Sequence, residues 1–318
     1  MLCTNQRFAA LKIHEQKKCV FCGSPIVKKN GFKKGFQMYK CHACGRQFQA
    51  GARLDPHVLL DEYVHGKQTY AQLGEKYHRS ARTIQRHFDK AMPRAAQRGQ
   101  VVANVVMDTT YFSDIGVMAF KNSLDGTILH IKMVSKETVK EYAKGVEFIQ
   151  GMGYSVQAIV ADGRRGIFNA FADIPVRLCQ FHQVKTVTKY LTKKPKTEAA
   201  KELRELALRL KTCSRSEFVS GLDNWLEKWK AVMDERTVFE EDGSIRGEYT
   251  HMNLRKAYHS LRRNIPHLFV FEEWKELDIP NTTNCLDGHF SDLKNKLRNH
   301  NGMKRERKIK VILEYFNS

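Results

Sequence analysis

Three aspartates stand where carboxylates commonly do chemistry. Asp108 ends an apolar run in "VVANVVMD", Asp162 ends another in "YSVQAIVAD", and Asp287 lies in the helical pattern "NTTNCLDGHFSDLKNKLR". Three carboxylates brought together cannot all stay ionised without a counter-charge, and divalent metal would supply it. Two Mg²⁺ (or Mn²⁺) ions roughly 4 Å apart would activate an attacking oxygen and stabilise the leaving one in phosphoryl transfer.

Taken singly, each aspartate could equally be a helix cap or a turn residue. Their order along the chain favours the catalytic interpretation of the set, because two follow apparent strands and the third opens a late helix. Asp292, five residues after Asp287, faces another side of that helix, so we expect it to take no part.

The elements that would position these side chains follow from the hydrophobic pattern. Short branched-aliphatic runs predict buried strands that stop at Asp108 and Asp162. Residues 117–123 and 127–134 predict antiparallel strands, and residues 138–150 predict a helix. This order is that of a ribonuclease-H-like catalytic core, a mixed sheet flanked by helices. The late helix would bury one apolar face, formed by Leu286, Phe290, Leu293 and Leu297.

Four cysteines predict a second metal site of another kind. They form two Cys-x-x-Cys pairs separated by 18 residues, namely Cys19 and Cys22, then Cys41 and Cys44. Four thiolates around a tetrahedral Zn²⁺ make a structural site, and this spacing is typical of a zinc ribbon. The alternatives are disulfides, which are disfavoured inside cells, and a redox Cys-x-x-Cys, which would not occur twice at this spacing.

Residues 55–90 predict three short helices, with Thr69 and Ser80 as candidate N-caps of the second and third. We expect a DNA-binding helix-turn-helix with four side chains projecting from its third helix. The alternative is an ordinary helical bundle with a solvated basic face. The four candidate DNA-binding residues are Arg79, Arg82, Gln85 and Arg86.

We therefore expect an α/β multidomain protein. Because 125 residues separate Asp162 from Asp287, the catalytic domain would contain an all-helical insertion. Within it, Trp225 and Trp229 are either core residues or a surface on which an unpaired base stacks. The expected parts are a basic arm with the zinc ribbon (1–50), the helix-turn-helix (54–92), a linker (93–103) and the catalytic domain (104–318) with its insertion (about 190–278).

The charge balance indicates the partner. Lys+Arg number 54 and Asp+Glu number 34, a formal net charge of +20, and the surplus is densest before residue 100. Such a surplus suits nucleic acid first and an anionic membrane surface second, against the alternative of a merely solvated surface. No run approaches the roughly 18 to 20 apolar residues of a membrane span, and no signal-peptide core is evident. We expect a cytoplasmic protein without a membrane partner.

The double Cys-x-x-Cys, the helix-turn-helix, "MDTTYF", "VADGRRGIF", "CQFH" and "NTTNCLDGHF" together resemble bacterial insertion-sequence DDE/DDD transposases of the Mutator-like superfamily, in their zinc-binding variant. The family's first two aspartates fall on Asp108 and Asp162. Its third position is usually glutamate, and here it is Asp287, one methylene shorter. The resemblance implies that Cys179 and His182 of "CQFH" lie near the active site and support transposon-end DNA. Zinc ligation by this pair is the lesser interpretation.

The resemblance also implies an activity: binding of terminal inverted repeats, followed by metal-dependent strand cleavage and strand transfer. Two DNA ends must be handled together, which implies a homo-oligomer, at least a dimer, associated with the bacterial nucleoid. Two rival functions are a structure-selective nuclease on the same core and a domesticated transposase that acts as a DNA-binding regulator.

Overall fold

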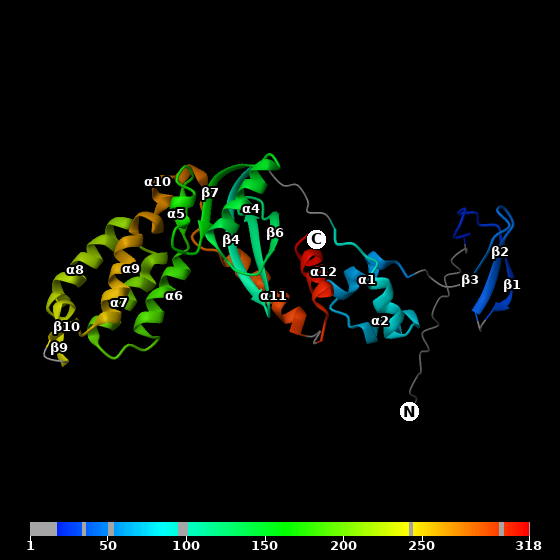
Figure 1. Ribbon diagram of the computed structural model, residues 1–318. Coiled ribbons are helices and arrows are strands. Elements are labelled where there is room, and N and C mark those ends of the chain that lie inside the picture. Colours follow the sequence, from blue (N-terminus) through cyan, green and yellow to red (C-terminus); the bar gives the residue numbers. More distant parts are fainter. Residues whose placement is uncertain are drawn as a thin grey trace, which may run out of the picture. The chain divides into compact units, whose positions relative to one another are not determined.

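The computed structural model describes residues 18–33, 36–49, 54–94, 101–241, 244–298 and 302–317. The chain divides into two compact units, Met1–Asp55 and Pro56–Ser318, and each is described on its own (Figure 1).

The first unit is a three-stranded antiparallel sheet made of β1 (Val27–Lys33), β2 (Phe36–Cys41) and β3 (Gln47–Gln49). Among the residues described in this unit, the buried hydrophobic core is very small and consists of Cys19, Tyr39, Cys41 and Phe48. A core of this size does not stabilise a fold by itself, and small domains usually add a metal or disulfides.

Three short helices open the second unit: α1 (Pro56–Val64), α2 (Tyr70–Tyr77) and α3 (Ala81–Phe88). Thr69 caps α2 in a capping box with Gln72, and Ser80 caps α3 by accepting from the Thr83 N–H. Arg79 therefore precedes the cap and lies in the turn between α2 and α3, so the expectation that it projects from the third helix is wrong. Arg82, Gln85 and Arg86 do lie on α3.

A five-stranded mixed sheet follows, in the order β6-β5-β4-β7-β8. Within this sheet, β4, β5 and β6 pair antiparallel. β7 pairs parallel with β4, and β8 pairs parallel with β7. The coarse expectation of a mixed α/β protein is thus confirmed. The strands are β4 (Val102–Phe112), β5 (Ile115–Asn122), β6 (Ile128–Val134), β7 (Ser155–Ala161) and β8 (Val176–Leu178).

Helices cover both faces of this sheet (Figure 1). On one face α4 (Val139–Gly151) buries Tyr142, Val146 and Ile149 against β4 and β5. Its Gly145 permits this close packing, because a Cβ there would stand 2.0 Å from the Phe120 ring. On the other face lie α11 (Asn284–Arg298) and α12 (Arg305–Phe316). The apolar face expected for the late helix is there: Leu286, Phe290 and Leu293 are buried, and Leu297 packs against them.

Between β8 and α11 stands a largely helical region with a core of its own. It also contains an antiparallel pair, β9 (Arg236–Glu241) and β10 (Ser244–Tyr249), so the expectation of an all-helical insertion is wrong. The short helix α5 (Ile167–Ala170) lies before this region, between β7 and β8. The helices of the region are α6 (Gln180–Leu191), α7 (Glu198–Leu208), α8 (Arg215–Asp234), α9 (Met252–Leu268) and α10 (Val270–Glu273), with 3₁₀ turns at Arg209–Lys211 and Lys275–Leu277.

Candidate active site and metal centres

The pairing of β4 with β7 brings Asp108 and Asp162 side by side. The parallel register of these strands runs as far as Val106 opposite Val160. Asp108 and Asp162 each stand two residues further along, so they occupy the same level on neighbouring strands. β7 ends at Ala161, whereas β4 continues to Phe112 against β5. Asp108 is therefore inside its strand rather than at its end, which corrects that expectation.

Asp287 lies in the first turn of α11 and is half-buried. Asp108 is 9% exposed and accepts a hydrogen bond from the Thr109 N–H at 2.8 Å. Burial raises the pKa of Asp108 to about 6; the charges of Asp287 and Asp162 add to this, and His182 opposes it. Asp162 and Asp287 are thus both near enough to Asp108 for their charges to act on its carboxyl, as a shared site requires.

The donor set at this point suits a hard divalent cation. One buried oxygen of Asp162, Oδ1, has no hydrogen-bond partner among the described residues. A buried carboxylate oxygen without a partner is costly unless something else satisfies it. Carboxylate oxygens are the ligands that Mg²⁺ prefers. The ligand oxygens of the three aspartates do not, however, all lie within 4.8 Å of one another.

Cys179 and His182 lie beside the aspartates at the start of α6. The thiol of Cys179 is buried, and Thr283, just before α11, donates to its Sγ from both N and Oγ1, at 3.4 and 3.5 Å. Burial disfavours the Cys179 thiolate, but interactions with His182 and Thr283 lower its pKa overall. The Cys179 side chain in turn raises the pKa of His182 to about 8, with help from Asp108 and Asp162.

Two residues near the aspartates were missed by the sequence analysis. Tyr142 of α4 shares a hydrogen bond of 2.8 Å with Thr109 and donates to Glu137 at 2.9 Å. Glu137 also forms an ion pair with Arg164, which follows Asp162. No motif in the sequence distinguishes Glu137 or Tyr142, because their role comes from the packing of α4 against β4.

A large pocket of about 1720 Å³ opens over Asp108 and Asp162. Its walls come from α6, α9, the segment before α4 and the segment after β7. Seven lysine or arginine side chains line it, against three carboxylates. The site therefore combines a small acidic centre with a positively charged approach, as expected for a polyanionic substrate.

The four cysteines converge in the first unit. Their Sγ atoms all lie within 4.8 Å of one another, with Cys19–Cys44 and Cys22–Cys41 at 3.6 Å. A disulfide would need sulfurs about 2.05 Å apart, whereas Zn–S bonds of about 2.3 Å place tetrahedral sulfurs about 3.8 Å apart. A Cys₄ cluster compatible with zinc is thus present. The very small core around it is what such a metal would stabilise.

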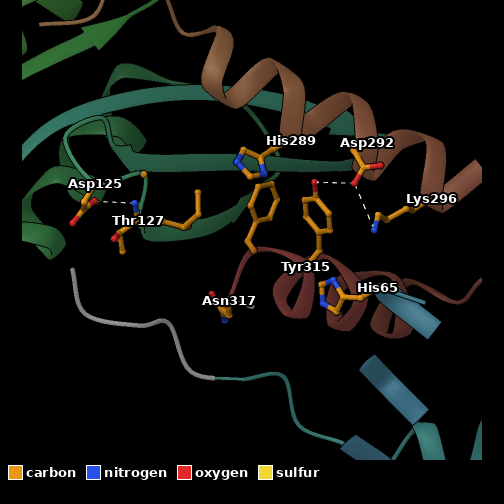
Figure 2. A pocket seen from close by; sticks show the side chains of 11 residues that line it. His65, Asp125, Thr127, His289, Asp292, Lys296, Tyr315 and Asn317 are labelled. Atoms are coloured by element: carbon orange, nitrogen blue, oxygen red, sulfur yellow. Dashed lines mark hydrogen bonds and ion pairs between the residues drawn. The ribbon is translucent and has the colours of Figure 1, made fainter. Parts of the chain in front are cut away.

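Asp292 lies away from the acidic centre, in a second pocket of about 470 Å³. Figure 2 shows its carboxylate between Tyr315 and Lys296. Tyr315 donates to it at 3.1 Å and Lys296 stands 3.5 Å away. His65, directly after α1, stacks against Tyr315 there, so this pocket is where the three-helix segment meets α11 and α12.

The two tryptophans lie in the helical region. Trp225 is 4% exposed, donates from Nε1 to the Ala199 carbonyl at 3.0 Å and stacks on Tyr258. It is a core residue, and no base can reach its face in this arrangement. Trp229 is half-buried and donates to Glu202 at 2.8 Å.

No protein-family model matches the chain. No curated protein matches it in sequence. Among solved structures, a chain of the simian T-cell lymphotropic virus intasome in complex with PP2A regulatory subunit B56 gamma matches with a TM-score of 0.21 and 12% identity. That match covers 48% of this chain and 67% of the other. A TM-score of 0.21 is too low for this likeness to assign either fold or role.

Across the described residues, no helix is both long and apolar enough to cross a membrane.

Proposed function

We propose that the protein is a DNA transposase whose metal-binding carboxylates are Asp108, Asp162 and Asp287. The observation that carries the proposal is the state of Asp108, a nearly buried carboxyl whose pKa is raised to about 6 by burial, with added effects of Asp287 and Asp162. A carboxyl that lines a pocket and whose pKa is shifted by burial and by neighbouring charges is typical of a functional site. The strand order β6-β5-β4-β7-β8 is also the one expected of a ribonuclease-H-like core.

Each group then has a defined task. The three aspartates would hold two Mg²⁺ ions, which supply activation of the attacking oxygen and stabilisation of the leaving oxygen in an in-line displacement. His182, with its pKa raised to about 8, is largely protonated at neutral pH and helps to keep Asp108 ionised. Thr283, bonded to Cys179, fixes the segment that leads into α11 and therefore the position of Asp287.

Recognition of DNA belongs to the N-terminal parts in this proposal. The ribbon would be closed by Zn²⁺ on its four cysteines. From residue 16 to residue 54 the sequence has nine lysines and arginines and no acidic residue, so this segment suits a phosphate backbone. The side chains of Arg82 and Arg86 on α3 are exposed, and in this proposal they would approach a groove. Because two transposon ends must be joined, the working form would be at least a dimer.

The test uses a supercoiled plasmid that carries the DNA flanking the gene on both sides. With Mg²⁺, the protein should cut at the element's ends and join them to new sites. Asp108→Asn, Asp162→Asn and Asp287→Asn should each abolish both steps while retaining DNA binding, whereas Asp292→Asn should stay active. Cutting without joining would instead identify a structure-selective nuclease. End binding without any turnover would identify a DNA-binding regulator. Either result refutes the transposase proposal.

A further inference from the structure

The pocket over the acidic centre carries positive charge that the protein itself leaves unbalanced. Of its seven basic side chains, Arg164 is ion-paired, to Glu137. The pocket-lining Lys185, Lys189, Lys193 and Arg263 form no ion pair with any residue in the described part of the chain. Cations left together without partners repel one another, so the arrangement favours an anionic ligand.

Several cations outside the pocket, in the same helical region, do have ion-pair partners. Lys201 pairs with Glu198, Lys228 pairs with Glu202, and Arg262 pairs with Asp223 at 2.9 Å. Arg262 and Arg263 are neighbours on α9, yet only Arg263 lines the pocket. Arg263 and three pocket-lining lysines thus stand, among the described residues, without an ion pair where a ligand could reach them together with the aspartates.

The basic residues of α6 form a row that starts at the acidic centre. His182 stands in the first turn, near enough to Asp108 and Asp162 for their charges to raise its pKa. Lys185 and Lys189 follow on the same helix, and Lys193 comes two residues after its end. At 1.5 Å per residue, Lys185 and Lys189 are separated by about 6 Å along the axis. Such a row can contact successive phosphates of one extended strand.

The pocket also offers groups that suit sugars and bases. Thr186, Thr188 and Thr192 contribute hydroxyl groups to its lining. Flat rings come from Tyr190 and from Phe168 and His267, which stack on each other with centroids 3.5 Å apart and planes 4° apart. A basic groove with aromatic faces is the usual design of sites for single-stranded nucleic acid.

The helix that carries this row is held firmly. Gln183 of α6 donates to Ser260 at 3.1 Å and accepts from Asn264 at 2.7 Å, and both partners lie on α9. Figure 1 shows α6 and α9 side by side. Because Gln183 is 2% exposed, these bonds are shielded from water and fix the two walls of the pocket relative to each other.

We propose that this pocket binds a single strand of DNA, with its phosphates along Lys185, Lys189 and Lys193 and its bases towards Tyr190, Phe168 and His267. This inference rests on the proposed function and deepens it. The DNA would reach the aspartates as a single strand, not base-paired, that lies along α6. Arg263, on the opposite wall, contacts the same strand.

Binding of a fluorescent single-stranded oligonucleotide to the full chain tests this. Asp162→Asn is present in every protein and Mg²⁺ is left out, so that no cleavage intervenes. Replacing Lys185, Lys189 and Lys193 by alanine should lower the affinity for the single strand. It should also reduce the slope of log K against log salt by about 2, since each phosphate contact contributes about 0.7. The matched control, with Lys201, Lys228 and Lys230 replaced by alanine, loses the same charge and should bind as before.

A single-residue comparison sharpens the result. Arg263→Ala should weaken single-strand binding several-fold. Arg262→Ala should not weaken it, because Arg262 lies outside the pocket and is ion-paired with Asp223. An equal loss for both triple variants would mean that only net charge matters, and no loss for either would leave the pocket without a nucleic-acid ligand. Either outcome overturns the inference, as does a loss that is equally large for duplex DNA of the same length.

The two proposals fail in different ways. If the unaltered protein cuts DNA but the α6 triple variant binds the single strand normally, the strand path is wrong and the transposase proposal stands. If no Mg²⁺-dependent cleavage occurs while single-strand binding depends on the α6 lysines, the pocket is confirmed and the transposase proposal fails.

Discussion

Asp89, at the end of α3, accepts two hydrogen bonds from Arg307 of α12, both at 2.6 Å. The hydrogen bonds from Arg307 are the main reason that the pKa of Asp89 is lowered. The pair ties the three-helix segment to the C-terminal helix, but its side chains are 42% and 23% exposed. Because the pair is partly exposed but bidentate, we expect Arg307→Ala to cost about 1 kcal/mol in urea unfolding.

Arg94 should matter more at the same junction. Its Nε stands 3.2 Å from Glu314, whose side chain is 2% exposed, and its Nη2 donates to Asp61 at 2.7 Å. Arg94→Ala would keep the bond from the Arg94 backbone N–H to Glu314 Oε2 at 2.8 Å but remove the positive charge beside this buried carboxylate, which costs about 2 kcal/mol. In Arg94→Ala combined with Glu314→Gln, most of that loss should be recovered. A cost for Arg94→Ala as small as that for Arg307→Ala would contradict this account.

Zinc removal should unfold the first unit alone. Because the described part of that unit buries four core residues, we expect the unit to depend on the metal for its free energy of folding. Cys41→Ser should release about one Zn²⁺ per chain and abolish the unit's melting transition. The transition of Pro56–Ser318, a separate compact unit, should be unchanged. Elemental analysis and calorimetry measure both effects, and Cys213→Ser serves as the control that keeps zinc.

The buried charge of Asp108 should make the metal-free protein less stable at neutral pH. Its pKa rises from 3.8 to about 6, so the folded state favours the protonated form. Protonated Asp108 therefore contributes about 3 kcal/mol to the free energy of unfolding relative to the ionised form. This contribution is present in full below pH 3.8 and is lost as the pH rises through about 6.

Asp108→Asn removes this penalty and should therefore raise the melting temperature of the metal-free protein at pH 7.5 while abolishing cleavage. Asp292→Asn, at a carboxylate outside the centre, should not raise it. The measurement is thermal unfolding in EDTA at pH 4 and pH 7.5. If Asp108→Asn lowers the melting temperature at pH 7.5, Asp108 is a stabilising cap and not a strained ligand.

Local patterns predicted much of this molecule. The strands before Asp108 and Asp162, the helix from 138 onwards and the caps Thr69 and Ser80 could be read from apolar runs and capping chemistry, because these depend on near neighbours in sequence. The Cys-x-x-Cys spacing likewise predicted a four-sulfur cluster. The end of β4 could not be placed, since the strand continues past Asp108 through pairing with β5.

Features made by tertiary packing escaped the sequence analysis. The β9–β10 pair was not expected, because the sequence on both sides of it has charged helical patterns. Glu137 and Tyr142 reach Arg164 and Thr109 only because α4 packs on the sheet. The unpaired row of Lys185, Lys189 and Lys193 resembles any solvated face until α9 is placed opposite it.

The placement of Arg79 in the turn and Arg82 on α3 yields the last prediction. Arg82 is exposed on the helix, one turn before Arg86, whereas Arg79 donates from Nη1 to the neighbouring His78 carbonyl at 3.2 Å. If α3 enters a major groove, Arg82→Ala and Gln85→Ala should each cost roughly 1 to 3 kcal/mol of preference for end DNA over random DNA. Arg79→Ala should weaken both duplexes about equally, as the loss of a backbone contact does. Competition binding at fixed salt measures the ratio, and an unchanged ratio in the Arg82 and Gln85 variants would place sequence recognition outside α3.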